Sequence, residues 1–167
     1  SEKLQPPAMW AYYHWIRNQV ATNTPWDQFA RQILTATGST LENGATNFYV
    51  LHQDPADLAE TTGVAFLGMA INCAKCHNHP LEKWTNDQYF GMANLFSRAK
   101  VKNASGEGNA TVFTVDRGEL LQPNKGKPQP PRPLDAEPVP FEATKDRREH
   151  LADWLVSPDN KYFARAI

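Results

Sequence analysis

Apolar side chains recur along most of this chain at intervals of three and four residues, the spacing of one face of an α-helix. The pattern predicts five helices, over residues 8–20, 25–37, 55–71, 86–96 and 144–155. The expected core side chains include Phe29, Ile33 and Leu34 in the second helix and Leu151, Trp154 and Leu155 in the last.

Two of these helices are expected to begin with a capping residue, Thr24 or Asp54. Each is followed by a proline, which fits the first helical turn because a backbone N–H at that position would have no partner within the helix. The fourth helix is expected to begin at Thr85-Asn86-Asp87. Gly38 is expected to end the second helix.

Between the fourth and fifth helices, the sequence pattern predicts two β-strands followed by an extended Pro-rich arm. Residues 112–115 and 119–121 predict a β-hairpin that turns at Gly118, while residues 123–140 hold seven of the 13 prolines. We therefore expect a mainly α fold with a small β-hairpin and a Pro-rich arm. The predicted division is a helical domain over 1–122, the Pro-rich linker or arm over 123–143, and the start of a following helical domain over 144–167.

Charge and hydropathy exclude several classes of partner. The 17 basic and 18 acidic residues give a formal net charge of -1, which argues against nucleic-acid or membrane-surface binding by bulk electrostatics. No apolar run reaches the roughly 18 residues that a membrane span requires. The chain begins with Ser1 rather than Met and shows no signal peptide, and residues 161–167 look like the start of an amphipathic segment without a cap, so we expect the chain to be a piece of something longer.

The chain has 2 Cys, and both lie in Cys73-Ala74-Lys75-Cys76-His77. Two thiols separated by two residues can reach the two vinyl groups on one edge of a haem, and the next histidine can then bind the iron. The motif predicts one covalently bound haem c, with Cys73 and Cys76 as anchors and His77 as the proximal iron ligand. Because this motif follows at least three predicted helices, the expected fold differs from the usual small cytochrome c fold.

Two other interpretations of the same segment stay open. A redox-active C-x-x-C pair would favour a helix N-terminus in a βαβ setting, which the helical surroundings do not suggest. A zinc site made of Cys73, Cys76, His77 and His79 has suitable ligand types, but its second pair follows too closely for a zinc-finger spacing.

The sixth iron ligand is not determined by the sequence. The candidates are two methionines on the flanking helices and three distant histidines, namely Met69, Met92, His14, His52 and His150. His79 follows the proximal histidine too closely to reach the far face of the same haem. We expect it to contribute to the cofactor site by orienting the proximal loop.

Three segments resemble a known family. Residues 66–69, 73–80 and 84–90 (FLGM, CAKCHNHP and WTNDQYF) are similar to the planctomycete-type cytochrome-like domain, long catalogued as a domain of unknown function. Residues 146–154 and 160–166 resemble the start of the partner domain that commonly follows it. The resemblance implies a large secreted protein, often with another cytochrome-like module upstream, and supports the assignment of Cys73, Cys76, His77 and His79.

The motif and the resemblance together predict a c-type cytochrome domain for electron transfer rather than a stand-alone enzyme. The expected location is periplasmic or extracellular, and the expected partner is a redox protein or an upstream cytochrome module. The alternatives are a peroxidase-like haem enzyme with an open sixth position and a zinc-knotted structural or surface module.

Overall fold

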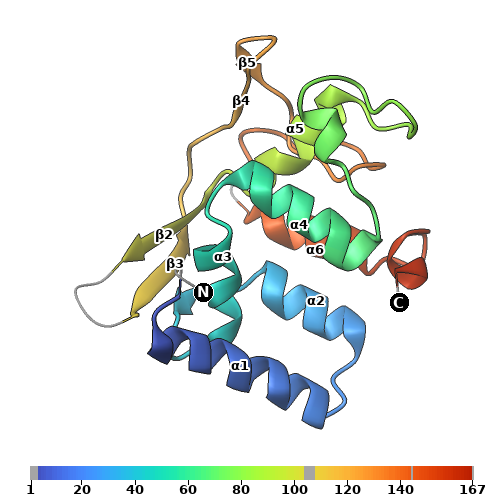
Figure 1. Ribbon diagram of the computed structural model, residues 1–167. Coiled ribbons are helices and arrows are strands. Elements are labelled where there is room, and N and C mark those ends of the chain that lie inside the picture. The colour runs from blue at the N-terminus through green and yellow to red at the C-terminus, as the bar shows by residue number, and fades with distance from the viewer. Residues whose placement is uncertain (1–3, 104–107, 144, 167) are drawn as a thin grey trace. The chain divides into compact units, whose positions relative to one another are not determined.

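The computed structural model describes residues 4–103, 108–143 and 145–166, and it divides the chain into two compact units (Figure 1). Unit 1 consists of Ser1–Gln53 and Ala99–Val115, and unit 2 consists of Asp54–Arg98 and Asp116–Ile167. The Cys-x-x-Cys-His segment lies in unit 2. The predicted division at residues 122 and 143 concerns the domains of a larger chain and stays a prediction.

Unit 1 combines helices with a three-stranded antiparallel sheet of order β1-β3-β2. Its elements are α1 (Pro6–Ala21), α2 (Trp26–Leu34), β1 (Gly38–Ser39), the 3-10 helix η1 (Gly44–Thr46), α3 (Asn47–Leu51), β2 (Ala99–Asn103) and β3 (Ala110–Thr114). A Cβ on Gly44 would lie 2.4 Å from the carbonyl oxygen of Ala11, so glycine is needed where η1 meets α1. Buried Val112 pairs with Val101 on one side and Gly38 on the other, at the centre of the sheet.

Unit 2 is built around α4 and α5, with a two-stranded antiparallel ribbon and a C-terminal helix. Its elements are α4 (Pro55–Leu67), the 3-10 helix η2 (Asn72–Lys75), α5 (Asn86–Asn94), β4 (Leu121–Gln122), β5 (Lys127–Pro128), α6 (Arg147–Leu155) and the 3-10 helix η3 (Phe163–Arg165). The core consists of fully buried apolar side chains from these elements and the loops between them: Leu58, Ile71, Tyr89, Met92, Phe96, Leu134, Leu151 and Leu155.

The predicted cap at Asp54 and the predicted start of a helix at Thr85 are confirmed. The side chain of Asp54 accepts hydrogen bonds from the backbone N–H groups of Ala56 and Asp57, at 2.7 and 3.3 Å. Thr85 forms a capping box with Gln88, in which each side chain bonds the backbone of the other residue.

The cap predicted at Thr24 is wrong. Helix α2 begins one residue later than expected, with Pro25 at the N-cap position and no side-chain cap. The hydroxyl of Thr24 instead contacts the hydroxyl of Thr22 at 3.0 Å, so a local contact competes with the cap.

Three helices end earlier than predicted. Helix α2 ends at Leu34, α4 ends at Leu67 rather than at residue 71, and α5 ends at Asn94 rather than at residue 96. Gly68 follows α4 with a φ of 64°, and the N–H of the next residue, Met69, donates to the carbonyl of Gly63 at 3.0 Å. Glycine adopts this left-handed conformation without the strain of a Cβ, so the chain can leave the helix here.

The prediction of a mainly α fold is wrong. About 45% of the structure is helical and 10% is strand, in two small sheets, which makes it a mixed α/β fold. The predicted hairpin over residues 112–121 is also replaced, because β3 pairs with β2 and β1, and β4 pairs with β5. Sequence patterns missed β1 and β2 because β1 has two residues and β2 carries exposed lysines.

The Pro-rich segment packs within unit 2. The N–H of Arg132 donates to the carbonyl of Gly91 in α5 at 3.0 Å, and Leu134 is fully buried. A proline-rich composition predicts an extended backbone, and such a backbone can still be covered by neighbouring side chains. The predicted start of the last helix, Thr144, lies outside the described residues, and α6 is capped by Asp146, which accepts from the N–H of Arg148.

A largely buried ion-pair cluster joins α6 to the end of α5. Two nitrogens of the Arg147 guanidinium donate to the two oxygens of Glu119 at 2.5 and 3.0 Å, and Arg98 donates to the same carboxylate at 2.9 Å. Burial favours a higher pKa for Glu119, but the hydrogen bonds from the two arginines outweigh it and lower the pKa.

Within the described ranges, no helix is long and apolar enough to cross a membrane.

Candidate functional site

The Cys-x-x-Cys-His segment forms a tight turn on the surface of unit 2. Helix η2 contains Cys73, and Cys76 directly follows it. The turn begins with the N–H of Ala74 bonded to the carbonyl of Ile71 at 2.9 Å. Both cysteines are free thiols and both are exposed, as is His77.

A buried asparagine fixes the backbone of this turn. The side-chain amide of Asn86, the first residue of α5, donates to the carbonyls of Ala74 and Lys75 at 2.7 and 2.8 Å. Its side-chain oxygen accepts a hydrogen bond from the amide of Gln122. Sequence analysis missed Asn86 and Gln122, because an asparagine in the first turn of a helix usually indicates only local capping.

Further hydrogen bonds connect the turn to α5 and to the β4–β5 ribbon. The side-chain oxygen of Asn78 accepts from the backbone N–H at the start of α5 at 3.0 Å, and Asn124 donates to the carbonyl of Cys76 at 3.3 Å. The carboxylate of Asp87 accepts hydrogen bonds from the side chains of Lys125 at 2.7 Å and Gln122 at 2.9 Å. The hydrogen bond from Lys125 is the main reason that the pKa of Asp87 is lowered. The turn is thus anchored at several points although its reactive side chains are exposed.

The two histidines of the segment have different environments. The Nδ1 atom of His77 lies 2.7 Å from the carbonyl oxygen of Asn78. Because a carbonyl can only accept, Nδ1 carries a proton in this contact, so Nε2 is the ring nitrogen that can bind a metal. The Nδ1 atom of His79 instead accepts from the N–H groups of Leu81 and Glu82, at 3.2 and 2.9 Å. His79 therefore stabilises the backbone turn that follows the motif.

Within the described part of the chain, Cys76 lines both a polar cavity and a largely apolar one. One has a volume of about 410 Å³ and is lined mainly by polar side chains of α5 and of the β4–β5 turn, together with His77. The other has a volume of about 360 Å³, and Ala56, Phe90 and Leu121 are among the apolar side chains that line it. Cys76 thus lies between a polar and a largely apolar cavity.

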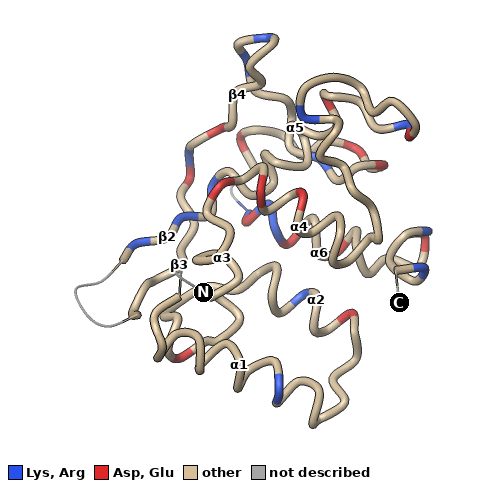
Figure 2. The backbone as a smooth tube through the Cα atoms, in the orientation of Figure 1, with Lys and Arg blue, Asp and Glu red and all other residues tan. Residues whose placement is uncertain are grey.

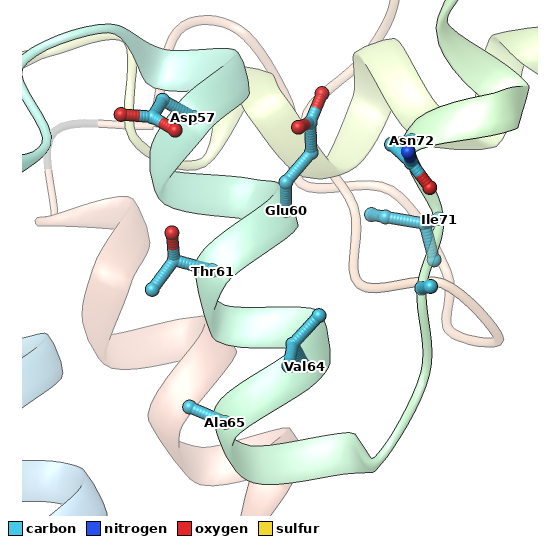
Figure 3. A pocket seen from close by; sticks show the side chains of 8 residues that line it. Asp57, Glu60, Thr61, Val64, Ala65, Ile71 and Asn72 are labelled. Carbon is cyan, nitrogen blue, oxygen red and sulfur yellow. The ribbon is translucent and has the colours of Figure 1, made fainter.

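A third cavity, of about 400 Å³, lies beside α4 near the start of the motif (Figure 3). Figure 3 shows Glu60 and Val64 on one side of this cavity, both from the face of α4 that is directed toward Ile71 and Asn72 on the other side. Glu60 accepts a hydrogen bond from the hydroxyl of buried Tyr89 at 2.5 Å. Burial is the largest cause of the raised pKa of Tyr89, followed by this hydrogen bond.

The proposed sixth ligands fall in both units. Met69, Met92 and His150 belong to unit 2 with the motif, and Met92 is fully buried. His14 and His52 belong to unit 1, where His14 is exposed against Trp10 and Tyr13 and His52 lies against Phe48. The choice among these five stays a prediction.

The segment offers two thiols and one imidazole nitrogen for bonding to another group. Within the described part of the chain, no three His, Cys, Asp or Glu side chains are grouped closely enough to hold a metal ion. The arrangement suits groups that bind the two thiols and His77 from the solvent side, because these three side chains are exposed on one short turn.

Comparison with known proteins identifies a family. Residues 1–101 match the model of the PSCyt2 family, which is described as a protein of unknown function (DUF1549). No curated protein and no solved structure matches the chain. The predicted resemblance is confirmed as far as the domain family, and its cytochrome-like nature stays a prediction. Because the match covers more than half of its 167 residues, the chain belongs to the PSCyt2 family, a planctomycete-type domain of unknown function.

Proposed function

We propose that this chain is a c-type cytochrome domain that holds one haem c through Cys73, Cys76 and His77 and takes part in electron transfer. The observation that carries the proposal is the chemistry of one short turn. It presents two free, exposed thiols next to an imidazole whose Nδ1 lies against a carbonyl oxygen.

The thiols are suited to covalent attachment. Neither is joined in a disulfide, and both are exposed on a turn whose backbone is hydrogen-bonded to Asn86. A fixed backbone limits the positions that the two sulfur atoms can take. The turn can therefore present both thiols to one rigid partner at a low entropy cost.

The imidazole is suited to be an axial ligand. Metal-bound histidines usually donate their other ring N–H to a carbonyl or carboxylate, which fixes the ring and raises its basicity. The contact between Nδ1 of His77 and the carbonyl of Asn78 has this form. The role of His79 as an orienting residue follows the same logic, because it stabilises the turn beyond the motif.

The surroundings also fit an apolar ring system. The cavity of about 360 Å³ beside Cys76 has apolar lining from Ala56, Phe90 and Leu121, and the side chain of Leu121 is more than half exposed. Covering this surface with an apolar group would be favourable, at about 25 cal/mol per Å².

When bound, haem c supplies reversible one-electron chemistry at its iron. The residues of this chain would hold and orient it, and the near-neutral surface would leave recognition of the redox partner to local contacts. A covalent anchor suits a protein that works in the periplasm or outside the cell, and we propose that location.

The decisive experiment is expression with a haem-attachment system, followed by haem staining after denaturing electrophoresis. We expect the wild-type chain to keep its haem after denaturation. Cys73→Ala and Cys76→Ala should each keep one thioether, which shifts the absorption of the pyridine complex, and the double variant should lose the stain. Lys75→Ala is the matched control, because this exposed residue lies between the two cysteines, and it should behave like wild type.

Three results would count against the proposal. Absence of covalent haem in the wild-type chain would refute it, and zinc without iron in metal analysis would favour the zinc-knotted module. Carbon monoxide binding by the reduced protein, with no strong ligand displaced, would favour the haem enzyme over electron transfer. A six-coordinate low-spin spectrum in both redox states is the expected outcome.

A further inference from the structure

Helix α1 has an exposed apolar stripe that its own unit does not cover. The stripe consists of Met9, Tyr13, Ile16 and Val20, whose exposed fractions are 39%, 51%, 36% and 75%. Trp10 borders it and is 54% exposed. Large apolar residues exposed singly are ordinary, but a row of five along one helix indicates an interaction surface.

The spacing of the stripe is that of a helix-pairing seam. Its four residues are separated by four, three and four positions, which places them alternately at the two apolar positions of a heptad. The opposite side of α1 is already used, since Ala8 is buried and Ala11 contacts Gly44 in η1. Helix α1 therefore has a second apolar face, beyond the one that anchors it.

The near absence of charged residues on α1 allows this face to pair with the same face of a second copy. Helix α1 contains no Asp or Glu and carries Arg17 as its only Lys or Arg, and its tube is almost uniformly uncharged in Figure 2. Two such faces meet without the repulsion of like-charged rows. An acidic or basic partner helix would find no complementary row of charges on α1.

The exposed area is sufficient for self-association. The five side chains leave on the order of 500 Å² of mainly apolar surface uncovered, given side-chain areas of roughly 150–250 Å² for aromatic residues. Two copies would bury about 1,000 Å², which is the lower limit for a specific interface. We infer that α1 is a dimer interface, in which the stripe of one copy packs against the stripe of a second copy.

An antiparallel pairing about a two-fold axis gives the best match of side chains. It places Tyr13 of one copy against Ile16 of the other, and Met9 against Val20, so large residues meet smaller ones. The same arrangement brings Arg17 of each copy beside Trp10 of the other, where a cation–π contact forms. The symmetry makes each of these contacts occur twice.

The test is the mass of the 167-residue chain by sedimentation equilibrium over a range of concentrations. We expect the mass to rise from 18.8 kDa toward twice that value. Tyr13→Glu and Ile16→Lys should each raise the dimer dissociation constant at least about tenfold, because each puts two unpaired charges into an apolar seam. Mixing the two variants should restore dimers, because Glu at 13 then faces Lys at 16.

Leu41→Lys is the matched control, because Leu41 is 41% exposed and lies outside α1, and it should dimerise like wild type. Circular dichroism checks that every variant keeps its helices. A wild-type chain that stays at 18.8 kDa throughout, or a dimer unaffected by both charged variants, would overturn the interface. A mixture of the two variants that stays monomeric would overturn the antiparallel pairing.

Discussion

Replacing Asn86 with alanine should release the backbone of the cysteine turn without touching a cysteine or a histidine. The asparagine amide donates to the carbonyls of Ala74 and Lys75, at 2.7 and 2.8 Å, and its oxygen accepts from Gln122. Its exposed fraction is 8%, so water does not readily replace these bonds in the folded chain. The truncation leaves three polar groups short of a partner.

The expected loss follows from those three groups. An unpaired buried donor or acceptor costs about 1–3 kcal/mol. Gln122 keeps its second bond to Asp87 at 2.9 Å, so most of the cost comes from the two carbonyls. Some of it is recovered if water enters the space left by the side chain. We expect Asn86→Ala to lower the free energy of unfolding by about 2–4 kcal/mol.

Urea denaturation of the reduced, haem-free chain measures this loss, and hydrogen exchange of residues 71–79 shows where it occurs. Asn124→Ala is the matched control, because Asn124 is exposed and makes one bond of 3.3 Å to the carbonyl of Cys76. The control should change the free energy of unfolding by less than about 0.5 kcal/mol. Equal losses in the two variants, or unchanged exchange in the turn of Asn86→Ala, would refute this account of how the turn is held.

Two further predictions concern the packing of each unit. Glu119→Gln should destabilise unit 2 by about 3 kcal/mol or more at neutral pH, because the guanidinium of Arg147 loses its buried counter-charge. Since the folded pKa of Glu119 lies below its ordinary value of 4.5, its stabilisation is complete above that pH and disappears as the pH falls. Denaturation curves at several pH values should therefore show the deficit of Glu119→Gln shrinking in acid, and a deficit independent of pH would contradict this reasoning. Gly44→Ala should destabilise unit 1 by about 1–3 kcal/mol, because its Cβ would lie 2.4 Å from the carbonyl oxygen of Ala11. Thermal unfolding should show a smaller loss for Gly126→Ala, whose Cβ would meet no atom within 4 Å and whose cost is backbone strain alone; a reversed order would be inconsistent with the packing.

Helix starts, which depend on residues close together in the chain, were predictable from the sequence. The cap predicted at Asp54 and the helix start predicted at Thr85 both depend on side chains two or three residues from the backbone groups they bind, and both were confirmed. The cap at Thr24 failed because Thr22, equally close in the chain, competes for its hydroxyl. Local patterns therefore indicate that a helix begins, and they are less reliable about which residue caps it.

Strand pairing and the support of the cysteine turn, which depend on residues far apart in the chain, were not predictable from the sequence. Strand β3 pairs with Gly38 and Ser39, more than seventy residues earlier in the chain, and no local pattern indicates such a pairing. The support of the cysteine turn is non-local in the same way, because Gln122 reaches Asn86 from another part of the chain. The motif itself could be recognised from five consecutive residues, while the groups that hold it in place required the structure.

The position of Arg147 has a consequence for how family boundaries relate to folding. The family model ends at residue 101, but the unit that contains the cysteine turn includes residues up to the C-terminal region. Arg147 and Glu119, both beyond the match, complete an ion-pair cluster with Arg98, and Gln122 completes the support of Asn86. The limit of sequence similarity thus falls between the two chain segments that together form unit 2. A chain that stopped at residue 101 would retain every residue of the motif and lose part of the framework that keeps the motif in shape.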